Sequence, residues 1–194
     1  MTHLTAVATD PVEPFQDPDL VDGFQGRAKR EGTEFKAHAL DYLVGLGCII
    51  VQAAHHVARY PVDALVETPN RQRLLVAAHG VFDDGPQAGL RRTDTVHKLG
   101  HRSHALARRH AARLVVVTSH LPEPGSAAAG YLADLHDDLG PWLVDVVATA
   151  GDLAGYHRLA RYLHTDPVPE PAPAPWWQAS PVVQTVLEFA GPAL

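Results

Sequence analysis

The chain is poor in cysteine, because Cys48 is the only one among its 194 residues. A single cysteine excludes an internal disulfide framework and a zinc site made of cysteines, and it suits a reducing, bacterium-like cytoplasm. No apolar run approaches the length that crosses a bilayer. The N-terminus has no basic start followed by an apolar core, so we expect neither a secretory signal nor a membrane partner.

Two further kinds of motif are missing. The glycines are scattered, without the G-x-x-x-x-G-K-[ST] or G-x-G-x-x-G spacing that cradles phosphates, so a nucleotide site is not expected. The sequence also has no G-x-S-x-G elbow, which argues against a serine hydrolase.

Length and composition predict one globular domain with a tail at each end. The hydrophobic fraction of 46% is ordinary for a chain with a real core. Residues 1–26 hold five acids and no Lys or Arg, and they predict a mobile acidic arm. The domain itself is expected over 27–164. Residues 165–194 begin with a proline-rich, semi-rigid linker and end in a predicted tail helix, where Trp176 and Trp177 offer contacts for a protein partner.

Charge is distributed unevenly along the chain. The net charge of −6 argues against nucleic acid, but the window 71–113 holds nine basic and three acidic residues, a local charge of +6. A basic face can bind phosphates even when the whole chain is acidic. The alternative is an arginine-rich face that only contacts solvent. The candidate DNA-binding residues are Arg91, Arg92, Arg102, Arg108 and Arg109.

Hydrophobic periodicity predicts the order helix, three strands, helix, strand, helix, strand, helix. In the first helix, Phe35, Ala39, Leu43 and Leu46 lie on one face and should be buried. Strands that cluster first and then alternate with helices indicate an α/β fold with a mixed central β-sheet flanked by helices.

Two of the expected strands form a hairpin with unusual polar residues. The run "PVDALVE" has Asp63 inside it, and the run "RLLVAAHG" ends in His79 and Gly80. A basic helix, "TDTVHKLGHRSHALARRHAA", follows after a loop.

These segments, from Glu31 to His120, resemble the restriction-endonuclease-like superfamily, the PD-(D/E)XK nucleases. "EGTEFKAHALDYL" looks like the first helix, whose glutamate would be Glu34, and "PVDAL" looks like the strand with the motif aspartate, Asp63. "LLVAAHG" falls where the superfamily has its E-x-K strand. The resemblance implies an αβββαβ core, DNA as the substrate and Mg²⁺ held by carboxylates. It also implies that Glu34, Asp63 and His79 occupy catalytic positions.

The E-x-K strand departs from the pattern, because Ala77 stands at the glutamate position and His79 at the lysine position. Alanine cannot bind a metal, and histidine lacks the permanent charge of lysine near neutral pH. Asp94 and Lys98 lie one helical turn apart, so Asp94 is a candidate replacement metal ligand beside Asp63, and Lys98 a candidate catalytic lysine. The alternative is that the Asp94 carboxylate stabilises the N-terminus of its helix and Lys98 contacts only solvent.

Three interpretations remain open. The first is a nuclease-fold domain with a degenerate active site and no metal, which binds DNA or acts as a structural partner in a nucleic-acid-handling complex. The second is an active Mg²⁺-dependent deoxyribonuclease with migrated catalytic residues. The third is a protein-interaction module that uses the tryptophan-bearing tail. A homodimer is open in each case.

Overall fold

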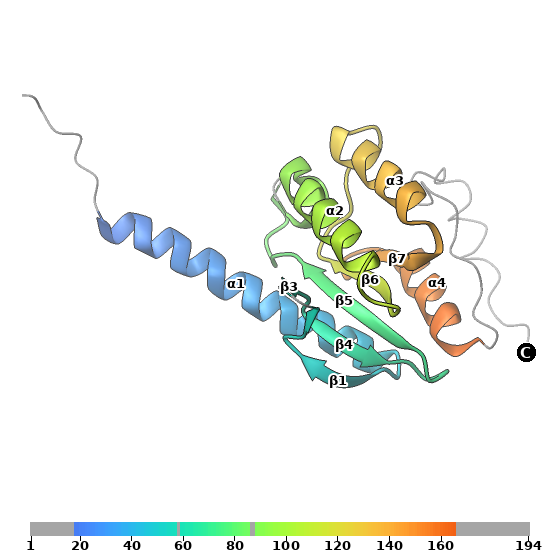
Figure 1. The fold of residues 1–194 in the computed structure, drawn as a ribbon. Coiled ribbons are helices and arrows are strands. Elements are labelled where there is room, and N and C mark those ends of the chain that lie inside the picture. The colour runs from blue at the N-terminus through green and yellow to red at the C-terminus, as the bar shows by residue number, and fades with distance from the viewer. Residues whose placement is uncertain (1–17, 58, 86–87, 166–194) are drawn as a thin grey trace, which may run out of the picture.

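The computed structural model describes residues 18–57, 59–85 and 88–165, with side chains from residue 30 onward (Figure 1). Trp176, Trp177 and the predicted tail helix lie outside the described residues. Within the described ranges, no helix combines the length and the apolar character needed to span a bilayer.

The first helix, α1 (Pro18–Gly45), is much longer than the sequence pattern predicts. It begins at Pro18, so residues 18–26 are helical where a mobile arm is expected. Proline suits the first position of a helix, since its missing N–H has no partner there in any case. The N-terminal half of α1 extends past the sheet (Figure 1). Its C-terminal half buries Phe35, Ala39 and Leu43, and Leu46 directly after it is also buried, as the spacing predicts.

A five-stranded mixed sheet forms the centre of the fold, in the spatial order β1-β4-β5-β6-β7. The β1-β4 and β4-β5 pairs are antiparallel, and the β5-β6 and β6-β7 pairs are parallel. The predicted mixed sheet is therefore confirmed, and a purely parallel nucleotide-binding sheet is excluded. The strands are β1 (Ile49–Ala53), β4 (Ala64–Glu67), β5 (Arg73–His79), β6 (Arg113–Thr118) and β7 (Leu143–Ala148).

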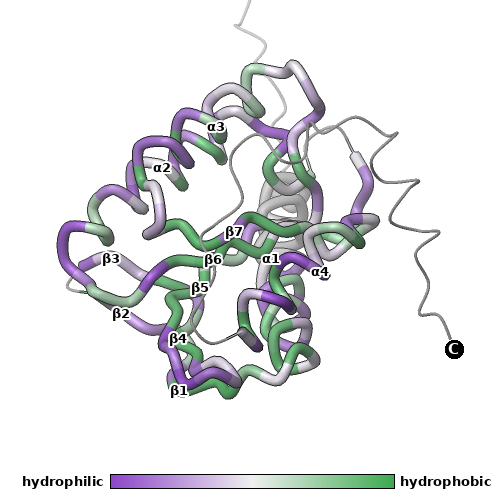
Figure 2. Tube along the Cα trace, turned by 90° about the vertical axis from the view of Figure 1, so that its right-hand side faces the viewer, coloured by the Kyte–Doolittle hydropathy of each residue, from purple (hydrophilic) through white to green (hydrophobic). Residues whose placement is uncertain are grey.

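Helices cover both faces of this sheet, as predicted. Figure 2 shows α2 (Thr93–Ala107) and α3 (Ala127–Leu139) on one side of the strands, with α1 and α4 (Leu153–His164) on the other. In β5, Leu74, Val76 and Ala78 join the core under α1 and α4, where Cys48 is also buried. Leu75 and Ala77 join the core under α2 and α3. A central strand that is buried on both faces accounts for the continuous apolar run of its sequence.

Four short elements complete the described part of the chain. Two-residue strands β2 (His56–Val57) and β3 (Tyr60–Pro61) form a small hairpin between β1 and β4 that the sequence pattern does not predict. Single 3₁₀ turns, η1 (Gly89–Arg91) and η2 (Gly140–Trp142), precede α2 and β7.

Candidate functional site

Asp63 lies at the junction between the small hairpin and β4, with its backbone and side chain both bonded to β5. Its N–H donates to the carbonyl of Val76 at 2.8 Å. Its Oδ2 accepts the N–H of Ala78, also at 2.8 Å. These two bonds fix the carboxylate against the strand that ends in His79. The predicted arrangement of Asp63 and His79 on neighbouring antiparallel segments is therefore present.

Ala77 and His79 of β5 face the same side of the sheet. Alternate residues of a strand point to the same face. Leu75 and Ala77 of β5 belong to the core under α2, and His79 continues that alternation. Leu65 of β4 belongs to the same core, and Asp63 lies directly before this strand. Ala77 is fully buried, with 0% exposure, and its methyl group offers no ligand atom on this side of β5.

Lys36 of α1 pairs with Asp63, a contact that the sequence pattern does not predict. Its Nζ lies 2.7 Å from Oδ1 of Asp63, and the Lys36 side chain is 53% exposed while that of Asp63 is 10% exposed. Glu34, the predicted catalytic residue of this helix, is exposed. The sequence signal for Lys36 was its place directly after the buried Phe35, at the border of the buried helix face.

Arg102 of α2 is partly buried and contacts His79. Its Nη2 lies 2.7 Å from Nε2 of His79. Because a guanidinium has no acceptor, Nε2 must accept the hydrogen bond and the ring proton must be on Nδ1. Burial, with the charges of Arg102 and Lys36, lowers the pKa of His79 to about 4, although Asp63 opposes the shift. At neutral pH His79 is therefore uncharged.

These contacts do not fit a divalent metal ion. Both oxygens of Asp63 already have partners, from Lys36 and from the N–H of Ala78. Two cations, Lys36 and Arg102, flank the one carboxylate, and Ala77 supplies no ligand. Mg²⁺ needs several oxygen ligands, preferably charged ones. Within the described part of the chain, no cluster of three or more His, Cys, Asp or Glu side chains is arranged to hold a metal.

Asp94 and Lys98, the candidate migrated catalytic residues, pair with each other, and Asp94 also pairs with Arg92 directly before the helix. Asp94, in the first turn of α2, lies 2.8 Å from Nε of Arg92 and 3.3 Å from Nζ of Lys98. The hydrogen bond from Arg92 lowers the pKa of Asp94. The structure thus brings Asp94 and Lys98 together, while the ion pair of Asp63 is with Lys36.

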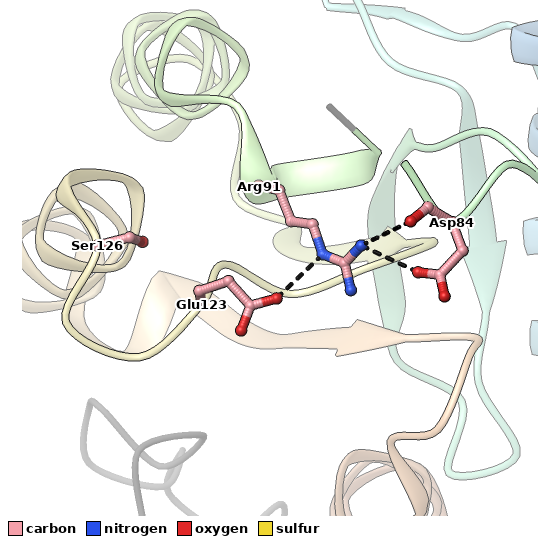
Figure 3. A pocket seen from close by; sticks show the side chains of 4 residues that line it. All are labelled: Asp84, Arg91, Glu123 and Ser126. Carbon is pink, nitrogen blue, oxygen red and sulfur yellow. Dashed lines mark hydrogen bonds and ion pairs between the residues drawn. The ribbon is translucent and has the colours of Figure 1, made fainter. Parts of the chain in front are cut away.

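Arg91 lines an open pocket of about 460 Å³ together with Asp84, Glu123 and Ser126. Nη1 of Arg91 lies 2.9 Å from Oδ1 of Asp84, and its Nε lies 3.3 Å from Oε1 of Glu123 (Figure 3). Two carboxylates against one guanidinium leave this pocket with a net negative charge. It is therefore a poor site for phosphate.

The five predicted DNA-binding arginines are thus divided by the fold. Arg91 and Arg92 pair with acids, and Arg102 contacts His79. Arg108 and Arg109 are exposed directly after the C-terminal end of α2. The +6 window of the sequence is consequently not a single basic surface.

Comparisons with known proteins add little to this geometry. No family model matches the chain, and no curated protein matches it significantly. A solved structure of Pyrococcus furiosus SfsA in complex with Ca²⁺ is similar, with 16% sequence identity and a TM-score of 0.35. The similarity covers 64% of this chain and 60% of that chain, which is less than two thirds of its length. A likeness of this degree assigns neither a family nor an ion.

Proposed function

We propose that this chain is a nucleic-acid-binding domain on a nuclease-type scaffold that does not cleave its ligand. The observation that carries the proposal is a pair of cation contacts beside the β4–β5 hairpin. Lys36 contacts Asp63, and Arg102 contacts His79. They place two positive groups where a nuclease of this type would hold a metal ion.

The hairpin has Ala77 and His79 where nucleases of the proposed type have the glutamate and lysine of their metal-dependent mechanism. Without a metal ion, neither the attacking water nor the leaving oxygen is stabilised. His79 is a poor substitute base, because its low pKa and the hydrogen bond from Arg102 leave its acceptor nitrogen weakly basic and occupied.

Binding of a polyanion fits the charge that remains. With His79 neutral, Lys36, Arg102 and Asp63 sum to a net charge of +1 at neutral pH. The Lys36 ammonium is half exposed, so a phosphate oxygen can replace or share its contact with Asp63. The exposed Arg108 and Arg109 add positive charge at the end of the same helix that carries Arg102. Contacts of this kind give affinity that falls steeply with salt.

The test combines binding and cleavage on the full chain. We expect a fluorescein-labelled oligonucleotide to show a salt-dependent rise in anisotropy, and a supercoiled plasmid to stay intact with Mg²⁺ or Mn²⁺. Plasmid cutting that Asp63→Ala abolishes would show an active nuclease and contradict the proposal. No binding of single-stranded or duplex DNA or RNA at low salt would also contradict it and would favour the protein-interaction module.

A further inference from the structure

An exposed basic and aromatic surface forms where the small β2–β3 hairpin meets the end of α2. It consists of Arg59, Tyr60, Arg108 and Arg109, and we refer to it as the Tyr60 patch. The guanidinium carbon of Arg59 lies 5.6 Å from the centroid of the Tyr60 ring, and that of Arg109 lies 5.3 Å from it. One aromatic ring therefore holds two cations from segments 50 residues apart in the sequence.

Two further contacts, besides those with the Tyr60 ring, hold the Tyr60 patch in place. Nη1 of Arg109 donates to the carbonyl of Ala105 at 2.8 Å, which fixes the guanidinium against α2. The rings of His55 and His110 lie edge to face with centroids 6.1 Å apart, so they join the same two segments a second time. Side chains that are already ordered lose less conformational entropy when they bind a ligand.

Both segments of the Tyr60 patch come from stretches of the sequence without acids. Residues 42–62 contain no Asp or Glu, and neither do residues 95–122. Arg92 and Lys98, at the other end of α2, pair with Asp94 instead. On α3, Asp138 faces His104, one turn before Arg108. The Tyr60 patch thus contains three arginines and no carboxylate of its own.

The patch also continues toward the candidate site. Arg102 lies on α2 itself, and Arg109 follows the end of this helix seven residues later in the sequence. Tyr60 precedes Asp63 by three residues. A chain of phosphates that runs from the Tyr60 patch to Arg102 would reach the contacts of His79 and Asp63.

We infer that the Tyr60 patch is a binding surface for single-stranded nucleic acid. The inference rests on the proposed function and names the surface that performs it. A guanidinium stacked on a ring keeps its N–H edges free for phosphate oxygens. Arginine and tyrosine together provide planar groups on which unpaired bases stack, whereas the bases of a duplex are already stacked on one another.

The test measures binding of a fluorescein-labelled oligo-dT 20-mer by anisotropy across a salt series. We expect the double variant Arg59→Gln/Arg109→Gln to bind at least tenfold more weakly. Its slope of log affinity against log salt should be flatter by about 1.4, since each lost phosphate contact on a single strand accounts for about 0.7. Tyr60→Leu should weaken binding about tenfold through lost stacking, and Tyr60→Phe should restore it.

Arg161→Gln on the exposed surface of α4 is the matched control, and it should bind like the natural chain. Thermal melting of each variant confirms that it is folded. If the natural chain binds and the Tyr60 patch variants bind equally well, this inference is wrong while the proposed function stands. Equal or tighter binding of a duplex, or of a polyglutamate peptide, would also overturn it. If the natural chain binds no nucleic acid, the proposed function itself fails.

Discussion

The guanidinium of Arg102 donates a hydrogen bond to His79 across the gap between α2 and the end of β5, at 2.7 Å. This contact links the middle of a basic helix to the strand position where the nuclease pattern has a lysine. It also couples the protonation of one imidazole to the stability of the fold, because the protonated ring would face a partly buried cation.

Lowering the pH should therefore destabilise the protein through His79. The pKa of His79 is about 4 in the folded chain against 6.5 ordinarily. Between these values the unfolded chain binds a proton that the folded chain does not, so stability present above pH 6.5 is lost as the pH falls toward 4. The loss is at most about 3 kcal/mol. Urea unfolding at several pH values measures it.

A His79→Gln variant isolates this effect. Glutamine offers Arg102 an acceptor and does not titrate. Asp145 titrates in the same range with the opposite sign, since burial raises its pKa to about 6 and its contribution is lost as the pH rises from 3.8. The contribution of Asp145 is the same in the natural chain and in His79→Gln. It therefore cancels in the difference between their free energies of unfolding. If the difference in free energy of unfolding between the natural chain and His79→Gln stays constant from pH 4 to 7, the coupling is disproved.

Rebuilding the nuclease motif should require removal of the cations as well as addition of the ligands. We expect the double change Ala77→Glu/His79→Lys to bind Mn²⁺ weakly, because Arg102 and Lys36 still flank Asp63. Adding Arg102→Leu should strengthen binding, and a tenfold excess of Mn²⁺ over its Kd should then stabilise the fold by about 1.4 kcal/mol. Thermal shift with and without EDTA measures this. Equal Mn²⁺ affinity in the natural chain would contradict it.

The buried pair of Asp145 and Arg158 should behave asymmetrically under substitution. Asp145 is 6% exposed and receives Nε and Nη2 of Arg158 at 3.0 and 3.1 Å. Arg158→Met leaves a buried carboxylate without its cation, and we expect a loss of about 3–5 kcal/mol at pH 7.5. Asp145→Asn together with Arg158→Met should recover much of this loss. Equal stability of the two variants at pH 7.5 would refute the prediction.

Gly89 should tolerate no side chain. Its φ of +56° belongs to the left-handed region, and an added Cβ would lie 2.6 Å from Oγ1 of Thr118 and 2.7 Å from backbone atoms of His120. Gly89→Ala should cost about 2–4 kcal/mol from strain and overpacking together. Gly85→Ala is the control, since its nearest contact would be 3.6 Å away. A loss below 0.5 kcal/mol in chemical denaturation would contradict this.

The sequence predicted those features that periodicity controls. Apolar spacing identified the buried face of α1, and the two apolar runs that hold Asp63 and His79 identified a pair of neighbouring antiparallel segments. The sequence did not predict that Lys36 contacts Asp63 or that Arg102 contacts His79. Those contacts depend on the angles at which α1 and α2 cross the sheet, which no local pattern encodes. Charge counting also failed to separate arginines with acidic partners, such as Arg91, from exposed ones, such as Arg109.

The burial of Cys48 allows its thiol to report on the motion of α1. This thiol is 4% exposed beneath α1, and burial raises its pKa to about 11. At neutral pH it is both shielded and almost entirely protonated, and alkylating reagents react with exposed thiolate. Its labelling rate therefore measures how often α1 lifts from the sheet, without any engineered probe.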